Sequence, residues 1–428
     1  MIAQDAGPKD SNSVTPYNGD TYYMHYMKVL GIIYLLIWHT GFGIMKINVF
    51  AISFFLQMFV FISGYFYNDK YSDNPLLFIK KRIISLYIPL ITYCSIFLCL
   101  NNVFVNLHIY KETQFIPWER FGAYLYQIMR LQPNLQMAGA MWYVCAIFLA
   151  AILFCLVSSI LKKIAQFNKS IKKVPKNSIE NTLNNPTDNT LNNPIDNTLN
   201  NPIDNTLNNP TVNTFNKSSQ PIESIRFFIV ISLFLYGNYL GFIKVTLQSF
   251  FDISLVFVLF FYSGYIYRKY ENRIPINIYM ALSSLFTLML CTKYGYPVIV
   301  NRSYINPPFL LICGLAGTYL NIYIAKKAPV IRNIKLSRFI EYAGKNTMAI
   351  LALHFLAFKP VSLLLIYFYH LPLHELASFP VIKYASLYHR IVYIAAGIIL
   401  PLSAKYLFDI VRFKIKLFFA TKSARSWQ

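Results

Sequence analysis

Long apolar stretches recur along this chain and constrain its fold more than any other feature of the sequence. The first two, residues 29–47 and 49–67, are each long enough to cross a bilayer, whose hydrocarbon core needs about 20 helical residues. Backbone groups inside that core must bond to one another, so such stretches form helices. The chain is 56% hydrophobic and 13% charged, whereas soluble domains carry about 25% charged residues. The sequence therefore predicts an all-α, polytopic membrane protein.

The spans can be placed and oriented from the sequence. Ten transmembrane helices are predicted, at 29–47, 49–67, 83–105, 140–161, 225–243, 246–267, 276–292, 307–325, 340–367 and 388–410. Clusters of Lys and Arg follow every second span. Because basic residues are retained on the cytoplasmic side, this alternation predicts cytoplasmic N- and C-termini.

The basic excess does not indicate a nucleic-acid partner. Lys and Arg number 39 against 17 acidic residues, a net charge of +22, but they gather at the ends of apolar runs and form no basic face. The six cysteines lie in or beside apolar runs, without metal-ligand or disulfide spacing. We therefore expect no nucleic acid, no metal and no disulfide framework, with the lipid bilayer as the surrounding partner.

The spans fall into two groups separated by a repeat. A polar tail (1–22) precedes the first four helices (23–164), and the other six (223–412) are followed by a basic tail (413–428). Between them, residues 165–222 contain a tandem octapeptide of the form N-T-L-N-N-P-x-D. One apolar residue in eight cannot build a stacked core, and Asn, Pro and Asp favour turns. We expect a flexible cytoplasmic linker.

The strongest functional candidate is His39 in the first span. An ionisable side chain within hydrocarbon is costly and usually faces a cavity or the bundle interior. Lys28 lies eleven positions earlier, about three turns, so the two share one helix face about 16 Å apart. The first two spans join near Asn48, and Gln57 follows Asn48 by as many positions as His39 precedes it. A hydrogen bond between Gln57 and His39 is therefore predicted; the alternative is a structural histidine bound to a neighbouring carbonyl.

Several motifs occur in a fixed order along the chain. They are Lys-x10-His at 28–39, F-I-S-G-Y-F-Y at 61–67, K-K-R-I-I-S-L-Y-I-P at 80–89, M-W-Y at 141–143 and A-G-K-N-T-M-A-I-L-A-L-H-F at 343–355. Together they resemble the integral-membrane acyltransferase type 3 family, whose members O-acylate sugars of surface polysaccharides and some other acceptors. The resemblance spans nearly the whole chain outside 165–222.

This resemblance implies an O-acyltransferase in a bacterial inner membrane. Its donor would be acetyl-CoA, a co-substrate and not a bound cofactor, and its acceptor a hydroxyl of a cell-surface polysaccharide or its lipid-linked precursor. His39 would be the general base, a role that contributes about 10²–10⁴-fold, with Gln57 beside it. The donor phosphates would meet Lys28, Lys81 and Arg82 at the cytoplasmic mouth.

Four further residues have two interpretations each. Trp142 and Tyr143 would stack on a sugar or belong to an interfacial aromatic belt. Asp252, inside the sixth span, and His354, inside the ninth, would line the same cavity or be structural.

Two alternatives to the enzyme remain open at this stage. A proton-coupled transporter or flippase for a glycan would use His39 and Asp252 to gate protons, and a catalytically inactive partner of a glycan synthase would use neither. Donor dependence separates them, because only a transferase consumes acetyl-CoA. The sequence does not specify the acceptor sugar, the acyl chain, the side of the membrane on which the ester forms, or the oligomeric state.

Overall fold

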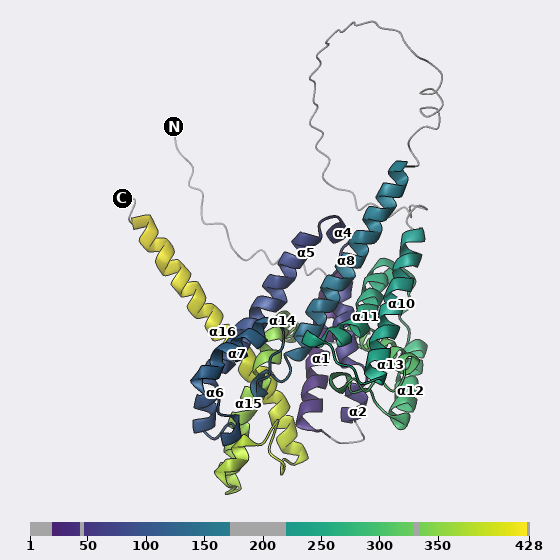
Figure 1. Ribbon diagram of the computed structural model, residues 1–428. Helices are drawn as coiled ribbons and strands as arrows, with labels where there is room; N and C mark the ends of the chain where they lie inside the picture. The colour runs from purple at the N-terminus through teal and green to yellow at the C-terminus, as the bar shows by residue number, and fades with distance from the viewer. Residues whose placement is uncertain (1–18, 43–46, 172–219, 328–333, 426–428) are drawn as a thin grey trace, which may run out of the picture.

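The computed structural model describes residues 19–42, 47–171, 220–327 and 334–425, which are almost wholly helical and contain no strand (Figure 1). The α-helices are α1 (Gly19–Thr40), α2 (Ile47–Ile52), α3 (Phe55–Tyr65), α4 (Lys70–Asp73), α5 (Pro75–Arg82), α6 (Ile88–Asn106), α7 (Trp118–Met129), α8 (Trp142–Ile171), α10 (Gln220–Phe242), α11 (Phe251–Tyr270), α12 (Ile278–Tyr294), α13 (Pro307–Lys327), α14 (Ile334–Lys345), α15 (Thr347–Phe368) and α16 (Leu387–Arg425). The all-α prediction is thus confirmed for the described residues.

Within these residues, eight helical segments are long and apolar enough to cross a membrane, and not ten as the sequence predicted. The protein is a multi-pass integral membrane protein. The other two predicted spans also form helices, but each falls short for a different reason. The first corresponds to α1, whose apolar character is diluted by polar side chains such as Lys28 and His39. The seventh corresponds to α12, which has only 17 residues.

Three predicted spans have interruptions that the hydrophobic pattern did not show. The second is divided into α2 and α3 around Ser53 and Phe54. The ninth is divided at Asn346, which separates the amphipathic α14 from the buried α15. The third starts earlier than predicted, at Pro75, and continues to Asn106 through a π-helical turn (η2, Ile83–Tyr87). Such wide turns occur mostly as single insertions within α-helices and often lie near functional sites.

Several predictions concern residues outside the described part of the chain. The octapeptide repeats lie within 172–219, Lys46 of the turn predicted near Asn48 lies in the gap at 43–46, and most of the N-terminal tail precedes residue 19. Their predicted roles stay predictions. Helix α1 begins at Gly19, before the predicted end of that tail, and α16 extends through most of the predicted C-terminal tail.

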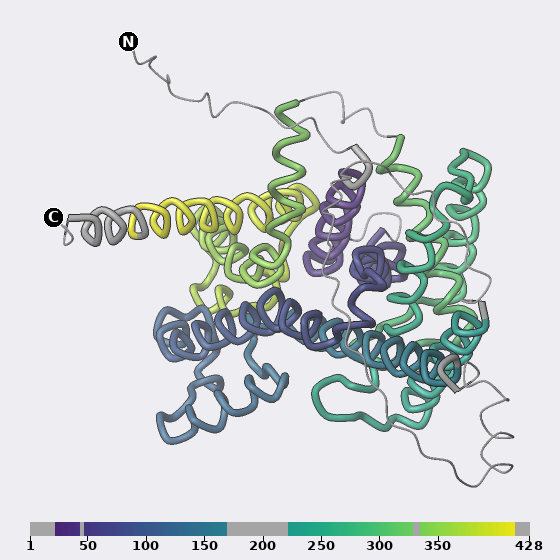
Figure 2. The backbone as a smooth tube through the Cα atoms, turned by 90° about the horizontal axis from the view of Figure 1, so that it is seen from above, coloured from purple at the N-terminus to yellow at the C-terminus, as the bar shows by residue number. Residues whose placement is uncertain are grey.

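Helices α1 and α3 lie at the centre of the bundle. Viewed from above, α1 is surrounded by α13 on one side and by α15 and α16 on the other (Figure 2), and it also packs on α3 and α14. This position explains how a helix of mixed polarity is accommodated. Its polar side chains contact other parts of the protein, because neighbouring helices separate α1 from the lipid.

A very close helix contact joins two copies of one short motif, Ser-Gly-Tyr. Gly64 of α3 lies against the backbone of α11, where a Cβ atom on Gly64 would be 1.8 Å from the carbonyl oxygen of Phe261. The reciprocal contact places Gly264 of α11 against α3, with its Cβ position 1.9 Å from the carbonyl oxygen of Phe61. Only glycine allows two helix backbones to approach this closely, a common device between helices in membranes.

The tyrosines of the two motifs reach across the contact to acidic residues at one end of the bundle. Tyr65 donates a hydrogen bond of 2.7 Å to Glu271, and the hydroxyl of Tyr265 lies 2.9 Å from Asp69. Glu271 is also paired with Lys326 at the end of α13, at 2.7 Å. The basic clusters that follow α11 and α13 are therefore held together at this end, as expected if they share one side of the membrane.

The glycine contact predicts that Gly64→Ala and Gly264→Ala each destabilise the protein, because a methyl group would force α3 and α11 apart. Overpacking of this kind costs about 1–3 kcal/mol or more. Thermal unfolding of the purified protein in detergent measures the loss. Gly122→Ala in α7 is the matched control, since nothing lies within 4 Å of its Cβ position and alanine favours a helix by up to about 1 kcal/mol. Equal unfolding temperatures for all three variants would contradict the prediction.

Candidate active site

His39 lies in the last turn of α1 and packs against two residues of α15. Its ring centroid is 5.2 Å from that of His354, with the planes tilted by 31°. It is 4.7 Å from the ring of Phe355, edge to face. His39 is half-buried, whereas His354 and Phe355 are buried. We call these three residues the histidine layer.

The hydrogen bonds of His354 determine which of its ring nitrogens is protonated. Its Nδ1 lies 2.9 Å from the carbonyl oxygen of Leu351 and 3.2 Å from that of Ile350. A carbonyl can only accept, so Nδ1 carries the proton and Nε2 of the neutral ring is an acceptor. This Nε2 is buried without a hydrogen-bond partner. The Nδ1 atom of His354 therefore has a structural role, as a donor to the helix backbone. Its Nε2 atom is a buried acceptor in the ring next to His39.

A cavity of about 190 Å³ begins one helical turn from the histidine layer. Leu35 of α1 and Leu351 of α15 line it, and each lies four positions before a member of the layer, His39 or Phe355. Most of its wall is apolar, with two cations, Lys28 and Arg82. We call it the basic cavity. Its lining residues are Lys28, Ile32, Leu35, Leu56, Phe59, Ile62, Ser63, Phe66, Arg82, Leu86, Tyr143, Val144, Ile147, Thr347, Met348 and Leu351.

The two cations of the basic cavity come from different helices and have no acidic partner within ion-pairing distance among the described residues. The amino group of Lys28 lies 5.3 Å from the ring centroid of Phe66. Arg82 donates a long hydrogen bond, 3.4 Å, to the carbonyl oxygen of Ser63 and lies over the ring of Phe78. Both are half-buried. Cations held this way retain unused hydrogen-bond donors and attract an anion.

Of the other predicted donor contacts, Lys81 points elsewhere. It is exposed and donates to the hydroxyl of Tyr71 at 3.1 Å, without lining the basic cavity. Neighbouring positions on a helix face different directions, so Arg82 and Lys81 cannot both face the cavity.

The predicted hydrogen bond between Gln57 and His39 does not occur in the structure. Gln57 is fully buried, and its Nε2 donates to the carbonyl oxygen of Ser53 at 3.1 Å. Its Cβ lies against Gly314 of α13. The symmetric count placed the junction of the two spans at Asn48, but α1 ends at Thr40 and Asn48 lies inside α2. The break between α2 and α3 then changes the direction in which Gln57 points.

The aromatic pair at the start of α8 is divided between two environments. Tyr143 is buried, lines the basic cavity and donates to the carbonyl oxygen of Leu56 at 3.3 Å. Trp142 is half-buried, does not line that cavity, and lies 6.0 Å from the ring of Phe250. Tyr143 is thus placed to contact a molecule in the basic cavity, which the interfacial interpretation did not suggest.

Asp252 belongs to an ion pair and lines none of the cavities described here. It is fully buried in the first turn of α11, 2.7 Å from Nε of Arg302 and 3.3 Å from its Nη2. The backbone N–H of Leu247 also donates to it, at 3.3 Å. Arg302 is fifty residues away in the sequence and lies in a loop, so no sequence pattern connected the two.

The fold and the histidine layer define a multi-pass membrane protein with titratable groups buried among its helices. Residues 21–174 match the model of the Acyltransferase 3 family, described as an acyltransferase domain. This match confirms the resemblance over α1 to α8 and implies an acyltransferase enzyme. His39 and both cations of the basic cavity lie in the matched range, whereas His354 and Phe355 lie beyond it. No curated protein and no solved structure matches the chain significantly.

The Asp252–Arg302 pair predicts a purely structural role for Asp252. Arg302→Met leaves a buried carboxylate unpaired, which costs about 3–5 kcal/mol of stability. The double variant Asp252→Asn/Arg302→Met should regain most of that loss and transfer acyl groups at the wild-type rate per folded molecule. Unfolding in detergent and ester formation in membranes measure the two quantities. A stable double variant without transferase activity would instead make Asp252 part of the reaction.

Proposed function

We propose that the protein transfers an acyl group, in the simplest case acetyl, from acyl-CoA to a hydroxyl of a cell-surface glycan or its lipid-linked precursor. The main support is the position of the histidine layer, one turn beyond a cavity that has cations at its other end.

We further infer that the chain crosses the membrane ten times, with α1 and α12 in addition to the eight apolar spans. The shared end of the basic clusters supports a cytoplasmic location for both termini, in a bacterial inner membrane.

The basic cavity suits the donor. The phosphates of acyl-CoA would meet Lys28 and Arg82, and its thioester arm would run along the apolar wall toward His39. About 16 Å of helix separates Lys28 from His39, so the arm must be flexible and extended, as a thioester on a linear chain is. Tyr143 borders the route.

His39 then acts as the general base. In its neutral form it takes the proton of the acceptor hydroxyl while that oxygen attacks the thioester carbonyl carbon. The new C–O bond forms, the C–S bond breaks, and the departing CoA thiolate takes the proton back from His39. The buried Nε2 of His354 provides a second acceptor in the layer, which positions either the hydroxyl or the His39 ring.

The transporter hypothesis has less support. It required Asp252 and His39 to share a proton path, but Asp252 is paired with Arg302 and lines no described cavity. Measuring acyl-CoA consumption and ester formation by the purified protein distinguishes the two functions, because a carrier produces neither.

The base assignment predicts that His39→Gln loses transfer by about two to four orders of magnitude. Glutamine can hydrogen-bond but cannot accept a proton at neutral pH. His354→Asn is the matched control, because its amide N–H can replace the Nδ1–H bond to Leu351 while the Nε2 acceptor is removed. We expect it to keep more activity than His39→Gln. Rates are measured in membranes at equal protein amounts, and the reverse order would assign the base to His354.

The donor assignment predicts that Arg82→Glu raises the KM for acetyl-CoA by about ten- to hundredfold, the equivalent of one charge-assisted hydrogen bond. Turnover at saturating donor should change little. Lys80→Glu makes the same charge reversal on an exposed residue of α5 that does not line the basic cavity. An equal change in KM for both variants would mean that only the general charge of this end matters.

A further inference from the structure

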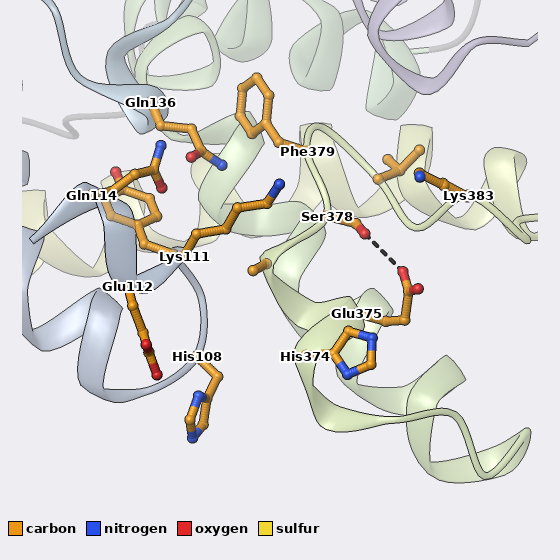
Figure 3. Close-up of a pocket in the computed structure, with 13 residues that line it drawn as sticks. His108, Lys111, Glu112, Gln114, Gln136, His374, Glu375, Ser378, Phe379 and Lys383 are labelled. Atoms are coloured by element: carbon orange, nitrogen blue, oxygen red, sulfur yellow. Dashed lines mark hydrogen bonds between the residues drawn. The ribbon is translucent and has the colours of Figure 1, made fainter.

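A second, larger pocket lies between two loops, and none of the sequence motifs identified it. Its volume is about 920 Å³, within the range of about 300–1,000 Å³ typical of small-molecule sites. One wall comes from residues 108–114 and Gln136, and the other from residues 374–383 (Figure 3). We call it the loop pocket. Its lining residues are His108, Tyr110, Lys111, Glu112, Gln114, Gln136, His374, Glu375, Ala377, Ser378, Phe379, Val381 and Lys383.

The loop pocket opens at the opposite end of the bundle from the mouth of the basic cavity. Arg82 precedes the long helical part of the Pro75–Asn106 span, and His108 follows its end. The same order holds on α15, where Met348 and Leu351 line the basic cavity and the loop that follows the helix lines the loop pocket. A molecule in the loop pocket therefore arrives from the other side of the membrane than the donor.

Both walls of the pocket are held in place by buried contacts. The amide of Asn102 bonds both the N–H and the carbonyl of Ile116, at 2.9 and 2.7 Å. On the other wall, the buried amino group of Lys359 donates to the carbonyl oxygens of Leu376 and Ser378, each at 2.8 Å. A pocket with fixed walls binds a ligand at a smaller entropic cost.

The lining favours a ligand rich in hydroxyl groups and without strong charge. Its two lysines are balanced by Glu112 and Glu375, and Lys111 reaches into the space between the loops (Figure 3). The Oε1 atom of Gln114 and the Nε2 atom of Gln136 are an acceptor and a donor without partners. Neutral hydroxyls satisfy acceptors and donors alike, whereas a polyanion would need an excess of cations.

Tyr110 adds a donor that remains protonated. Its hydroxyl accepts the N–H of Met137 at 3.1 Å, and burial raises the pKa of Tyr110 to about 12. The hydroxyl proton therefore remains for a ligand. Phe379, with 41% of its surface exposed, offers an aromatic face on which a sugar ring can stack.

Two aromatic rings connect this pocket with the base. Phe379 lines the pocket, and its ring centroid is 4.6 Å from that of Phe355. Phe355 in turn touches His39 in the histidine layer, at 4.7 Å. Gly139 lies beside both rings, and a Cβ atom at its position would be in van der Waals contact with Phe355, at 3.4 Å, and with Phe379, at 3.7 Å. Movement of these rings would open a path from the loop pocket to His39.

We propose that the loop pocket is the acceptor site, that it takes an uncharged segment of a glycan, and that the acceptor hydroxyl reaches His39 past Phe379 and Phe355. This inference rests on the proposed transferase function. It places the ester on the side of the membrane opposite to the donor.

The test fills the pocket and measures donor hydrolysis and acyl transfer to the glycan separately. Lys111→Trp should lower the base-labile ester on surface glycans at least tenfold, while hydrolysis of acetyl-CoA by the purified variant without acceptor stays within twofold of wild type. Glu119→Trp is the control, an exposed residue in the first turn of α7, just after this loop and outside the pocket. Lys111→Cys extends the test to protein that has already folded. A bulky, membrane-impermeant maleimide added to intact cells should label it and stop ester formation.

The outcomes are distinct. If wild-type protein neither hydrolyses acetyl-CoA nor forms an ester, the proposed function is wrong. If wild type is active and both the Trp variant and the labelled Cys variant form normal amounts of ester, the acceptor site is elsewhere. Equal loss of hydrolysis and transfer would also overturn the inference, because the pocket would then not be separate from the donor site. Mass spectrometry of the ester-bearing sugar checks its charge, and a carboxylate, sulfate or phosphate on that sugar would contradict the ligand class.

Discussion

The reciprocal contact of Gly64 and Gly264 is the constraint on which the arrangement of the other helices depends. It brings the backbones of α3 and α11 together without intervening side chains, and packing at this distance stabilises helices where lipid provides no hydrophobic drive for association. The tyrosines beside the glycines then bind acidic side chains, Glu271 and Asp69, that follow the other copy of the motif in the chain. Helix α1 packs on α3, so the position of His39 depends on this contact through one helix.

The sequence was sufficient for the helices but not for their interruptions. Hydrophobic runs located every membrane helix, because the bilayer requires length and apolarity from any span. The breaks at Ser53 and Asn346 were missed, since they arise where one helix packs on another and leave no trace in hydropathy. The count of ten spans exceeded the eight that qualify by length and apolarity. Helix α1 accommodates polar residues inside a bundle that the sequence does not display, and α12 has only 17 residues.

The candidate site shows the same division. Lys28, Arg82 and His39 could be singled out from the sequence because helix periodicity and motif order indicate which residues share a face, and their chemical roles stay predictions. Gln57 and Asp252 were assigned incompletely, because their partners, Ser53 and Arg302, depend on local breaks and on a distant loop. The loop pocket was missed because irregular segments have no periodicity from which to predict their contacts. The only sign of it in the sequence is the length and mixed charge of the loops at 106–139 and 368–387.

The π-helical turn at Ile83–Tyr87 has a geometric consequence for both the basic cavity and the loop pocket. Its hydrogen bonds span one residue more than those of an α-helix, so side chains before the turn are rotated by about 100° relative to an unbroken helix. Arg82 immediately precedes this turn, and Asn102, which holds one wall of the loop pocket, lies well beyond it. The extra residue therefore acts as a phase shift. Because of this rotation, the one helical span Pro75–Asn106 can direct Arg82 toward the basic cavity near one end and Asn102 toward Ile116 near the other.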